Sequence, residues 1–184
     1  NSEKMVNELT ERKNKLNKQL ENLSIKQFDL GFKMGTLGLF RLAKTVFPYM
    51  ERRGKGTLIA TSSTASVRGN RGQHSHAAAM GARRMLCQTL NDEFSVKGIH
   101  IVHTIIDGAV DAPDTLGKML GAEAYKKLRK EKGQSNDGLI LPEKIAEAYY
   151  YLSQQHRSTW THEIDFRSYN DQPWWNTPSD NYNF

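Results

Sequence analysis

Apolar positions in the first half of the chain follow helical spacing. Residues 1–23 place a valine and several leucines at alternating three- and four-residue steps if Lys13 fills one gap, which predicts a polar amphipathic helix. Ser24 followed by Gln27 is typical of a helix N-cap with a capping box. The apolar spacing after this cap predicts a long helix to about Arg53, and a second long helix is predicted at about 74–96.

Short apolar runs alternate with these helices. Residues 57–61 and 99–106 predict strands on either side of the helix at 74–96, and residues 164–166 predict a last short strand. A strand–helix–strand order with a crossover longer than a dozen residues is typical of a parallel βαβ unit. The pattern therefore predicts an α/β layer structure with a parallel sheet.

The remaining segments are shorter or irregular. Residues 113–132 predict two short helices and Pro142 to about Gln155 another, with proline in its first turn. The last segment is rich in Asn, Asp, Pro and aromatic residues and has no period. We expect three parts: a polar helix at 1–23, an α/β domain at 24–167 and an irregular aromatic tail at 168–184.

Composition restricts the function classes. The 184 residues suit one domain, and the formal net charge of +6 permits an anionic partner. The basic residues are scattered, however, so nucleic acid is not the expected partner, although Trp174 and Trp175 keep RNA stacking open as an alternative. The single cysteine, Cys87, excludes an internal disulfide. No apolar run reaches the roughly 18 residues of a membrane span, and the charged first residues do not form a signal peptide.

The histidines do not predict a metal site. His74 and His76 lie two residues apart on a predicted helix, so their side chains point in different directions. His100 and His103 lie three apart on a predicted strand and therefore on opposite faces. No cysteine or carboxylate spacing completes a ligand set, so we expect no metal.

Several segments in sequence order resemble the short-chain dehydrogenase/reductase family. They are the run Gly-Thr-Leu-Ile-Ala-Thr-Ser-Ser at 56–63, the small residues at 77–82, the strand and turn at 99–113, and Trp-Thr-His-Glu-Ile-Asp at 160–165. The resemblance covers about 24–167 and implies a Rossmann-like parallel sheet with flanking helices. It further implies that the fold is truncated to the C-terminal half of the family fold, with an added N-terminal helix.

The same resemblance assigns four catalytic positions, of which one is kept. The family uses a Ser that orients the substrate carbonyl, a Tyr acid/base thirteen residues later, a Lys four residues further, and an Asn in the preceding helix. The Ser position holds Ser63, but the Tyr, Lys and Asn positions hold His76, Met80 and Gly35. Histidine still exchanges a proton near neutral pH, whereas methionine supplies no cation. The resemblance therefore implies a pseudoenzyme with vestigial positions at Gly35, Ser63, His76 and Met80.

The cofactor side of the resemblance departs from the family as well. No glycine-rich turn follows an apolar strand in residues 1–30, so no place for a dinucleotide pyrophosphate is indicated. In the late turn, Asp107 stands at the Pro position and Ala112 at the Thr position that faces the nicotinamide. We therefore expect no bound cofactor.

These departures favour a non-catalytic accessory or structural subunit of a larger protein assembly. We expect other protein subunits as partners and a dimer through the helices at 27–53 and 74–96, where Gly31, Gly35 and Gly38 permit close approach. The basic pI and the start at Asn1, which indicates a removed leader or an earlier part outside the sequence, favour a mitochondrial location, with the cytoplasm as alternative. The alternative function is an active NAD(P)-dependent oxidoreductase that uses His76 in place of the tyrosine, and RNA binding is the second alternative.

Overall fold

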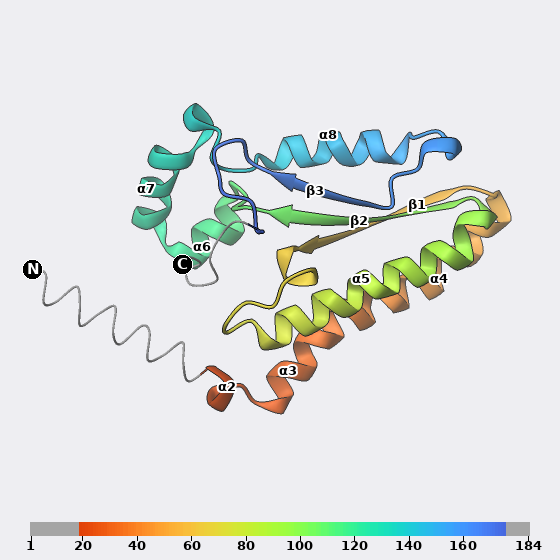
Figure 1. Cartoon of the computed structure of the whole chain (residues 1–184), viewed down its shortest axis with the longest axis horizontal. Coiled ribbons are helices and arrows are strands. Elements are labelled where there is room, and N and C mark those ends of the chain that lie inside the picture. The colour runs from red at the N-terminus through yellow and green to blue at the C-terminus, as the bar shows by residue number, and fades with distance from the viewer. Residues whose placement is uncertain (1–18, 176–184) are drawn as a thin grey trace, which may run out of the picture.

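Three parallel strands form the sheet in this computed structural model, which describes residues 19–175. Their order is β1 (Gly56–Ser63), β2 (Ile99–Asp107) and β3 (Glu163–Arg167). Figure 1 shows α4 (Gly38–Arg53) and α5 (His74–Phe94) along one face of the sheet and α8 (Pro142–Ser153) along the other. The expected α/β fold with a parallel sheet and flanking helices is therefore confirmed.

The long first helix forms as predicted, with one interruption. Ser24 caps α3 (Ile25–Phe32) through the predicted capping box with Gln27. A π-helical turn at Lys33–Leu37 joins α3 to α4, so the helical chain continues to Arg53. The predicted helix at 1–23 lies mostly outside the described residues. Its described end forms the short helix α2 (Gln19–Asn22).

The remaining elements lie mainly at the two ends of the strands. A π-helical turn at Pro113–Gly117, α6 (Lys118–Leu120) and α7 (Ala122–Lys132) follow the carboxyl end of β2. Short 3-10 helices occur at Thr64–Ser66, Ser95–Lys97, Gln134–Asn136 and Arg157–Thr159. The carboxyl ends of the strands, the helices after β2 and the segment after β3 therefore meet at one end of the molecule.

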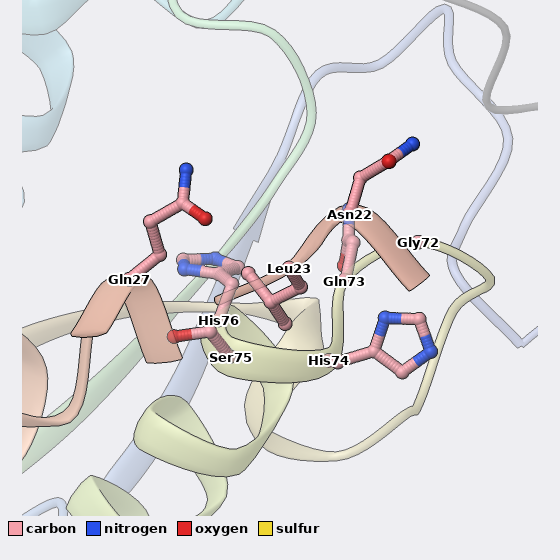
Figure 2. A pocket seen from close by; sticks show the side chains of 8 residues that line it. All are labelled: Asn22, Leu23, Gln27, Gly72, Gln73, His74, Ser75 and His76. Atoms are coloured by element: carbon pink, nitrogen blue, oxygen red, sulfur yellow. The ribbon is translucent and has the colours of Figure 1, made fainter. Parts of the chain in front are cut away.

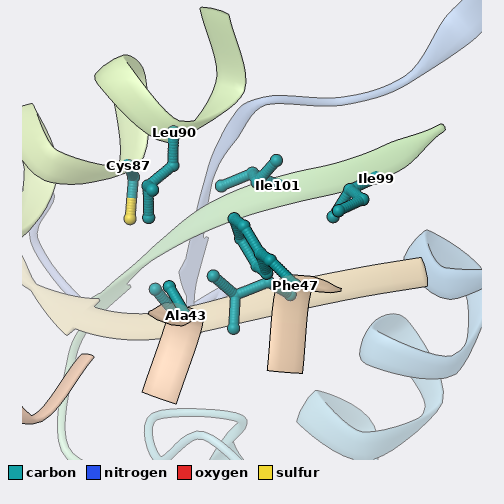
Figure 3. Close-up of a cluster of buried hydrophobic side chains, with 8 residues drawn as sticks. Ala43, Phe47, Cys87, Leu90, Ile99 and Ile101 are labelled. Atoms are coloured by element: carbon teal, nitrogen blue, oxygen red, sulfur yellow. The ribbon is translucent and has the colours of Figure 1, made fainter. Parts of the chain in front are cut away.

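The apolar core lies between the sheet and the helix pair α4 and α5. β2 is the central strand and is buried over nearly its whole length, as expected for a parallel strand covered on both faces. Figure 3 shows Phe47 of α4 and Cys87 and Leu90 of α5 gathered against Ile99 and Ile101 of β2. Each large apolar side chain buried in this way contributes roughly 1.5–3 kcal/mol to folding.

A buried polar cluster joins β2 to β3. His103 is fully buried, and its Nδ1 lies 3.0 Å from Glu163 Oε2. Arg84 donates to both oxygens of Glu163 over 2.6 and 2.8 Å. This hydrogen bond lowers the pKa of Glu163, while burial lowers the pKa of His103. An ionised carboxylate only accepts, so neutral His103 carries its proton on Nδ1.

Two glycines of the first long helical stretch allow it to pack closely against α5 of the same chain. A Cβ on Gly31 would collide with Ser75 Oγ, and one on Gly35 would lie 2.9 Å from both Ala79 Cβ and Met80 Cε. Both glycines therefore face α5 of the same chain. The expectation that they shape a dimer interface is wrong for these two positions, because residues of α5 in the same chain already pack against them.

The contact at Gly35 predicts opposite effects for two glycine-to-alanine substitutions. Gly35→Ala should lower the free energy of unfolding by about 1–3 kcal/mol, since a methyl group there overpacks the helix contact. Gly81→Ala, in α5 with nothing within 4 Å of the added atom, should raise it by roughly 0.5–1 kcal/mol through helix propensity. Urea unfolding of both variants measures the difference, and equal effects would contradict the close contact.

The buried histidines predict that acid weakens the fold. Burial lowers the pKa values of His100 and His103 below the ordinary 6.5, so the unfolded chain binds more protons once the pH falls below 6.5. Their contribution is complete above that pH and is lost as the pH decreases. Glu163, with a pKa lowered from 4.5, adds a further loss below pH 4.5.

The measurement is the urea midpoint at about pH 7.5 and about pH 5.5 in constant salt. The midpoint should be lower at the acid pH, and His103→Gln should reduce this difference. A midpoint that stays constant between the two pH values would contradict the neutral, buried state of these histidines.

Candidate functional site

Ser63 and His76 meet at the carboxyl end of β1. Ser63 is the last residue of that strand, and His76 lies in the first turn of α5. Ser63 Oγ and His76 Nε2 are 3.0 Å apart. Ser63 Oγ also accepts from the backbone N–H of Ala65 over 3.3 Å, which leaves its own hydrogen to donate to a neutral His76. The structure thus brings together the two residues that the family spacing placed at the Ser and Tyr positions.

The surroundings of His76 favour its neutral form. Burial lowers the pKa of His76, and the positive charge of Arg83 lowers it further. A neutral imidazole holds a free lone pair on one ring nitrogen, so it accepts a proton from a hydroxyl group within hydrogen-bond reach. The Ser63–His76 pair is therefore equipped to remove a proton from an alcohol near neutral pH.

Gly35 and Met80, the other two mapped positions, are packing residues. Met80 is buried, and its Sδ accepts from Ser62 Oγ at 3.5 Å. Its methyl group occupies the space that a side chain at position 35 would need. The two departures from the family pattern are thus complementary: glycine at one position makes room for methionine at the other.

Arg83 is a site residue that the sequence analysis missed. Its Nε donates to the carbonyl oxygen of Gly35 over 2.5 Å, and its Nη1 donates to the carbonyl oxygen of Thr61. The sequence signal was a basic residue seven positions after His76, which is two helical turns and hence the same helix face. That signal was overlooked because a cation was expected only at position 80.

An open cavity of about 530 Å³ lies beside His76 (Figure 2). It lies between the first turn of α5 and the segment that joins α2 to α3. The lining combines three carboxamides with two imidazoles and small or apolar side chains: Asn22, Gln27, Gln73, His74, His76, Leu23, Gly72 and Ser75. This lining carries no carboxylate, ammonium or guanidinium group, so it suits a neutral ligand with hydrogen-bonding groups.

Asp107 is engaged by the segment that follows β3. Its carboxylate is buried and accepts from the backbone N–H of Trp174 over 3.0 Å. Burial raises the pKa of Asp107. The guanidinium of Arg167 lies 4.0 Å from the ring centre of Trp175. The residue at the family's Pro position thus anchors the chain after β3 across the carboxyl end of the sheet.

The described residues contain no group of three or more His, Cys, Asp or Glu side chains placed to hold a metal ion. Figure 2 shows the rings of His74 and His76 on different sides of α5, as their spacing predicted. His100 stacks on Trp160, at 4.9 Å between ring centres, whereas His103 binds Glu163. Within residues 19–175, no helix is long and apolar enough to cross a membrane.

Comparison with known proteins identifies the relatives of this chain. Residues 5–164 match the family model described as enoyl-(acyl carrier protein) reductase. A short-chain reductase, NovJ, from Streptomyces niveus is 33% identical over 120 residues, which cover 64% of this chain and 45% of NovJ. The chain thus spans about half the length of that relative.

Solved structures share the fold. A short-chain dehydrogenase from Rhodopseudomonas palustris is 27% identical, with a TM-score of 0.59 over 79% of this chain and 54% of its own. A gluconate 5-dehydrogenase from Burkholderia cenocepacia, solved with NADP and tartrate, is 19% identical, with a TM-score of 0.65 over 80% and 57%. The second likeness concerns the fold alone.

The match overturns one sequence-based expectation. A non-catalytic accessory subunit was expected from the three lost catalytic positions, and that interpretation is wrong because the chain matches a reductase family over most of its length. The three departures do not separate the chain from the family, and the structure keeps the residues at the Ser and Tyr positions, Ser63 and His76, hydrogen-bonded to each other. This chain belongs to the short-chain dehydrogenase/reductase family.

Proposed function

We propose that this chain is the acid/base part of an NAD(P)-dependent oxidoreductase that interconverts an alcohol and a carbonyl compound. The observation that carries the proposal is the 3.0 Å contact between Ser63 Oγ and His76 Nε2 at the carboxyl end of a parallel sheet. Open α/β sheets bind their ligands at that end. The family membership supports redox chemistry rather than hydrolysis.

The two side chains divide the work at the substrate oxygen. His76 takes the proton from the alcohol during oxidation and returns it to the carbonyl oxygen during reduction. Ser63 hydrogen-bonds the same oxygen and orients it toward His76. Because the pKa of His76 is lowered, the site near neutral pH is ready to accept a proton, which favours alcohol oxidation.

The residues of this chain account for the proton transfer in the reaction, not for the hydride transfer. A nicotinamide cofactor, when bound, would supply the hydride transfer. Residues 19–175 hold no glycine-rich strand-to-helix turn that would admit the pyrophosphate of such a cofactor. The proposed chemistry is therefore restricted to the proton transfer at Ser63 and His76.

The substrate class follows from the cavity beside His76. Carboxamides both donate and accept hydrogen bonds, and the lining offers no charge to pair with an ionic substrate. A neutral, hydroxylated compound fits this surface.

Activity assays test the proposal directly. NADP⁺ and NAD⁺ reduction with a panel of neutral alcohols, and the reverse reaction with the matching carbonyl compounds, should show turnover. His76→Phe should lower kcat by about 10²–10⁴-fold, the usual contribution of a general acid/base. The rate of alcohol oxidation should rise with pH as His76 loses its proton and then level off.

His156→Gln provides the control, because it removes an exposed histidine far along the chain that caps the 3-10 helix at Arg157–Thr159. It should retain wild-type rates. The same assays test the expectation that the chain is not an enzyme. Absence of turnover with every alcohol and carbonyl compound, together with absence of nucleotide binding by calorimetry, would overturn the proposed function and support that expectation.

We further propose that a second copy of the chain packs on the outer face of α4 and α5. A groove of about 350 Å³ runs there, and its apolar lining includes Phe40, Pro48 and Phe94. Lys44 and Glu93 lie along its sides. A two-fold axis would bring the same surface of a second copy against this groove, so its positive and negative residues can pair with each other.

Oligomeric state measured by light scattering tests this interface. The wild-type chain should have the mass of a dimer, and Phe40→Glu should give a monomer, because a carboxylate would be buried in the apolar contact. Tyr151→Glu, at an exposed position on α8 on the other face of the sheet, is the matched control and should remain dimeric. A monomeric wild-type chain at high protein concentration would contradict the interface.

A further inference from the structure

Arg83 occupies an unusual position for a half-buried cation. Its guanidinium donates to two backbone carbonyl oxygens, that of Gly35 in the π-helical turn and that of Thr61 in β1. Burial and the neighbouring Cys87 are the influences on its pKa, and no described carboxylate contributes. Arginine stays protonated in proteins, so a full positive charge is fixed between these two elements.

This charge lies close to the Ser63–His76 pair. Thr61 precedes Ser63 by two residues on β1, and Arg83 follows His76 by two helical turns on α5. A single side chain therefore ties together the π-helical turn, the strand that ends in Ser63, and the helix that carries His76. Met80, at the family's lysine position, cannot do this, because its thioether is packed between Ser62 and Gly35.

We propose that Arg83 is the positioning residue of the site: clamped on the carbonyl oxygens of Gly35 and Thr61, it holds the Ser63–His76 pair in place and supplies the fixed positive charge that position 80 lacks. The chemical meaning of this role rests on the oxidoreductase function proposed above. The charge repels a protonated imidazole and so favours the proton-accepting form of His76.

The other neighbours of His76 do not supply such a charge. On the β1 side it meets the Ser63 hydroxyl, and in the cavity it shares the lining with the carboxamide of Gln27 and the imidazole of His74. Arg83 is the one charged group that contributes to the lowered pKa of His76 among the described residues, after burial itself.

The test follows the titration of His76 in the full chain by NMR of its imidazole C–H signals, assigned by comparison with His76→Phe. Arg83→Gln should shift the His76 midpoint upward, because the repelling charge is removed. Arg83→Lys, which keeps the charge, should titrate near the wild type. Arg84→Gln is the matched control: it removes the same charge from the next residue of α5, whose partner is Glu163, and should leave the His76 midpoint in place.

A folded Arg83→Gln protein with the wild-type His76 midpoint would overturn the role of Arg83. If that variant does not fold, a folded Arg83→Lys protein whose His76 midpoint is raised would overturn it equally, because its charge is retained. The proposed enzyme function is judged separately by the turnover assays. Where turnover is present, Arg83→Gln should lower kcat with little change in KM and shift the acid limb of the pH profile to higher pH. Arg83→Lys should restore most of kcat and most of the wild-type position of the acid limb.

Discussion

At Gly35 the first long helix and α5 lie so close that an added Cβ would be 2.9 Å from two side chains of α5. Thr36 fixes the same approach by donating its hydroxyl hydrogen to the carbonyl oxygen of Ala79 over 2.7 Å. The rest of the site depends on this contact. It brings the carbonyl oxygen of Gly35 within reach of Arg83, and it sets the helix that presents His76 to Ser63. A larger residue at position 35 would separate the two helices and change all of these distances together.

The polar groups of the interior are arranged on two different principles. Glu163 is ionised and receives three hydrogen-bond contacts from Arg84 and His103, so the charge on β3 is neutralised locally. The site at the end of β1 instead keeps a guanidinium that donates to two backbone carbonyl oxygens. The first arrangement stabilises the fold and is lost in acid, whereas the second perturbs a neighbouring histidine. Arg83 and Arg84 are adjacent in sequence but differ in role, because they lie on different sides of α5.

Much of the fold was predictable from local patterns. The capping box at Ser24 and the apolar run of β2 are short-range signals that survive in the folded chain, and the parallel sheet follows from the crossover between β1 and β2. The Ser63–His76 pair was found by spacing alone. Arg83 was missed because a cation was expected only at position 80. Its spacing from His76 placed it on the right helix face, but its partners, backbone carbonyls 48 and 22 residues away, leave no pattern in the sequence. Gly31 and Gly35 were misassigned to a dimer interface because sequence shows that a residue is small and does not show which surface it faces.

Replacing tyrosine by histidine changes what a nearby cation must do. A phenol ionises to an anion, so a cation lowers its pKa by attraction and works best in close contact with the oxygen. An imidazolium loses its proton to become a neutral base. A nearby cation therefore lowers its pKa by repulsion and requires no contact with the ring. The unperturbed pKa of histidine is already near neutrality, so only a modest influence is needed. A cation at position 83 of the helix can therefore replace one at position 80, provided that it is partly shielded from solvent and so acts at a distance. The vacated position 80 is then available for an apolar side chain, and Met80 fills it against Gly35.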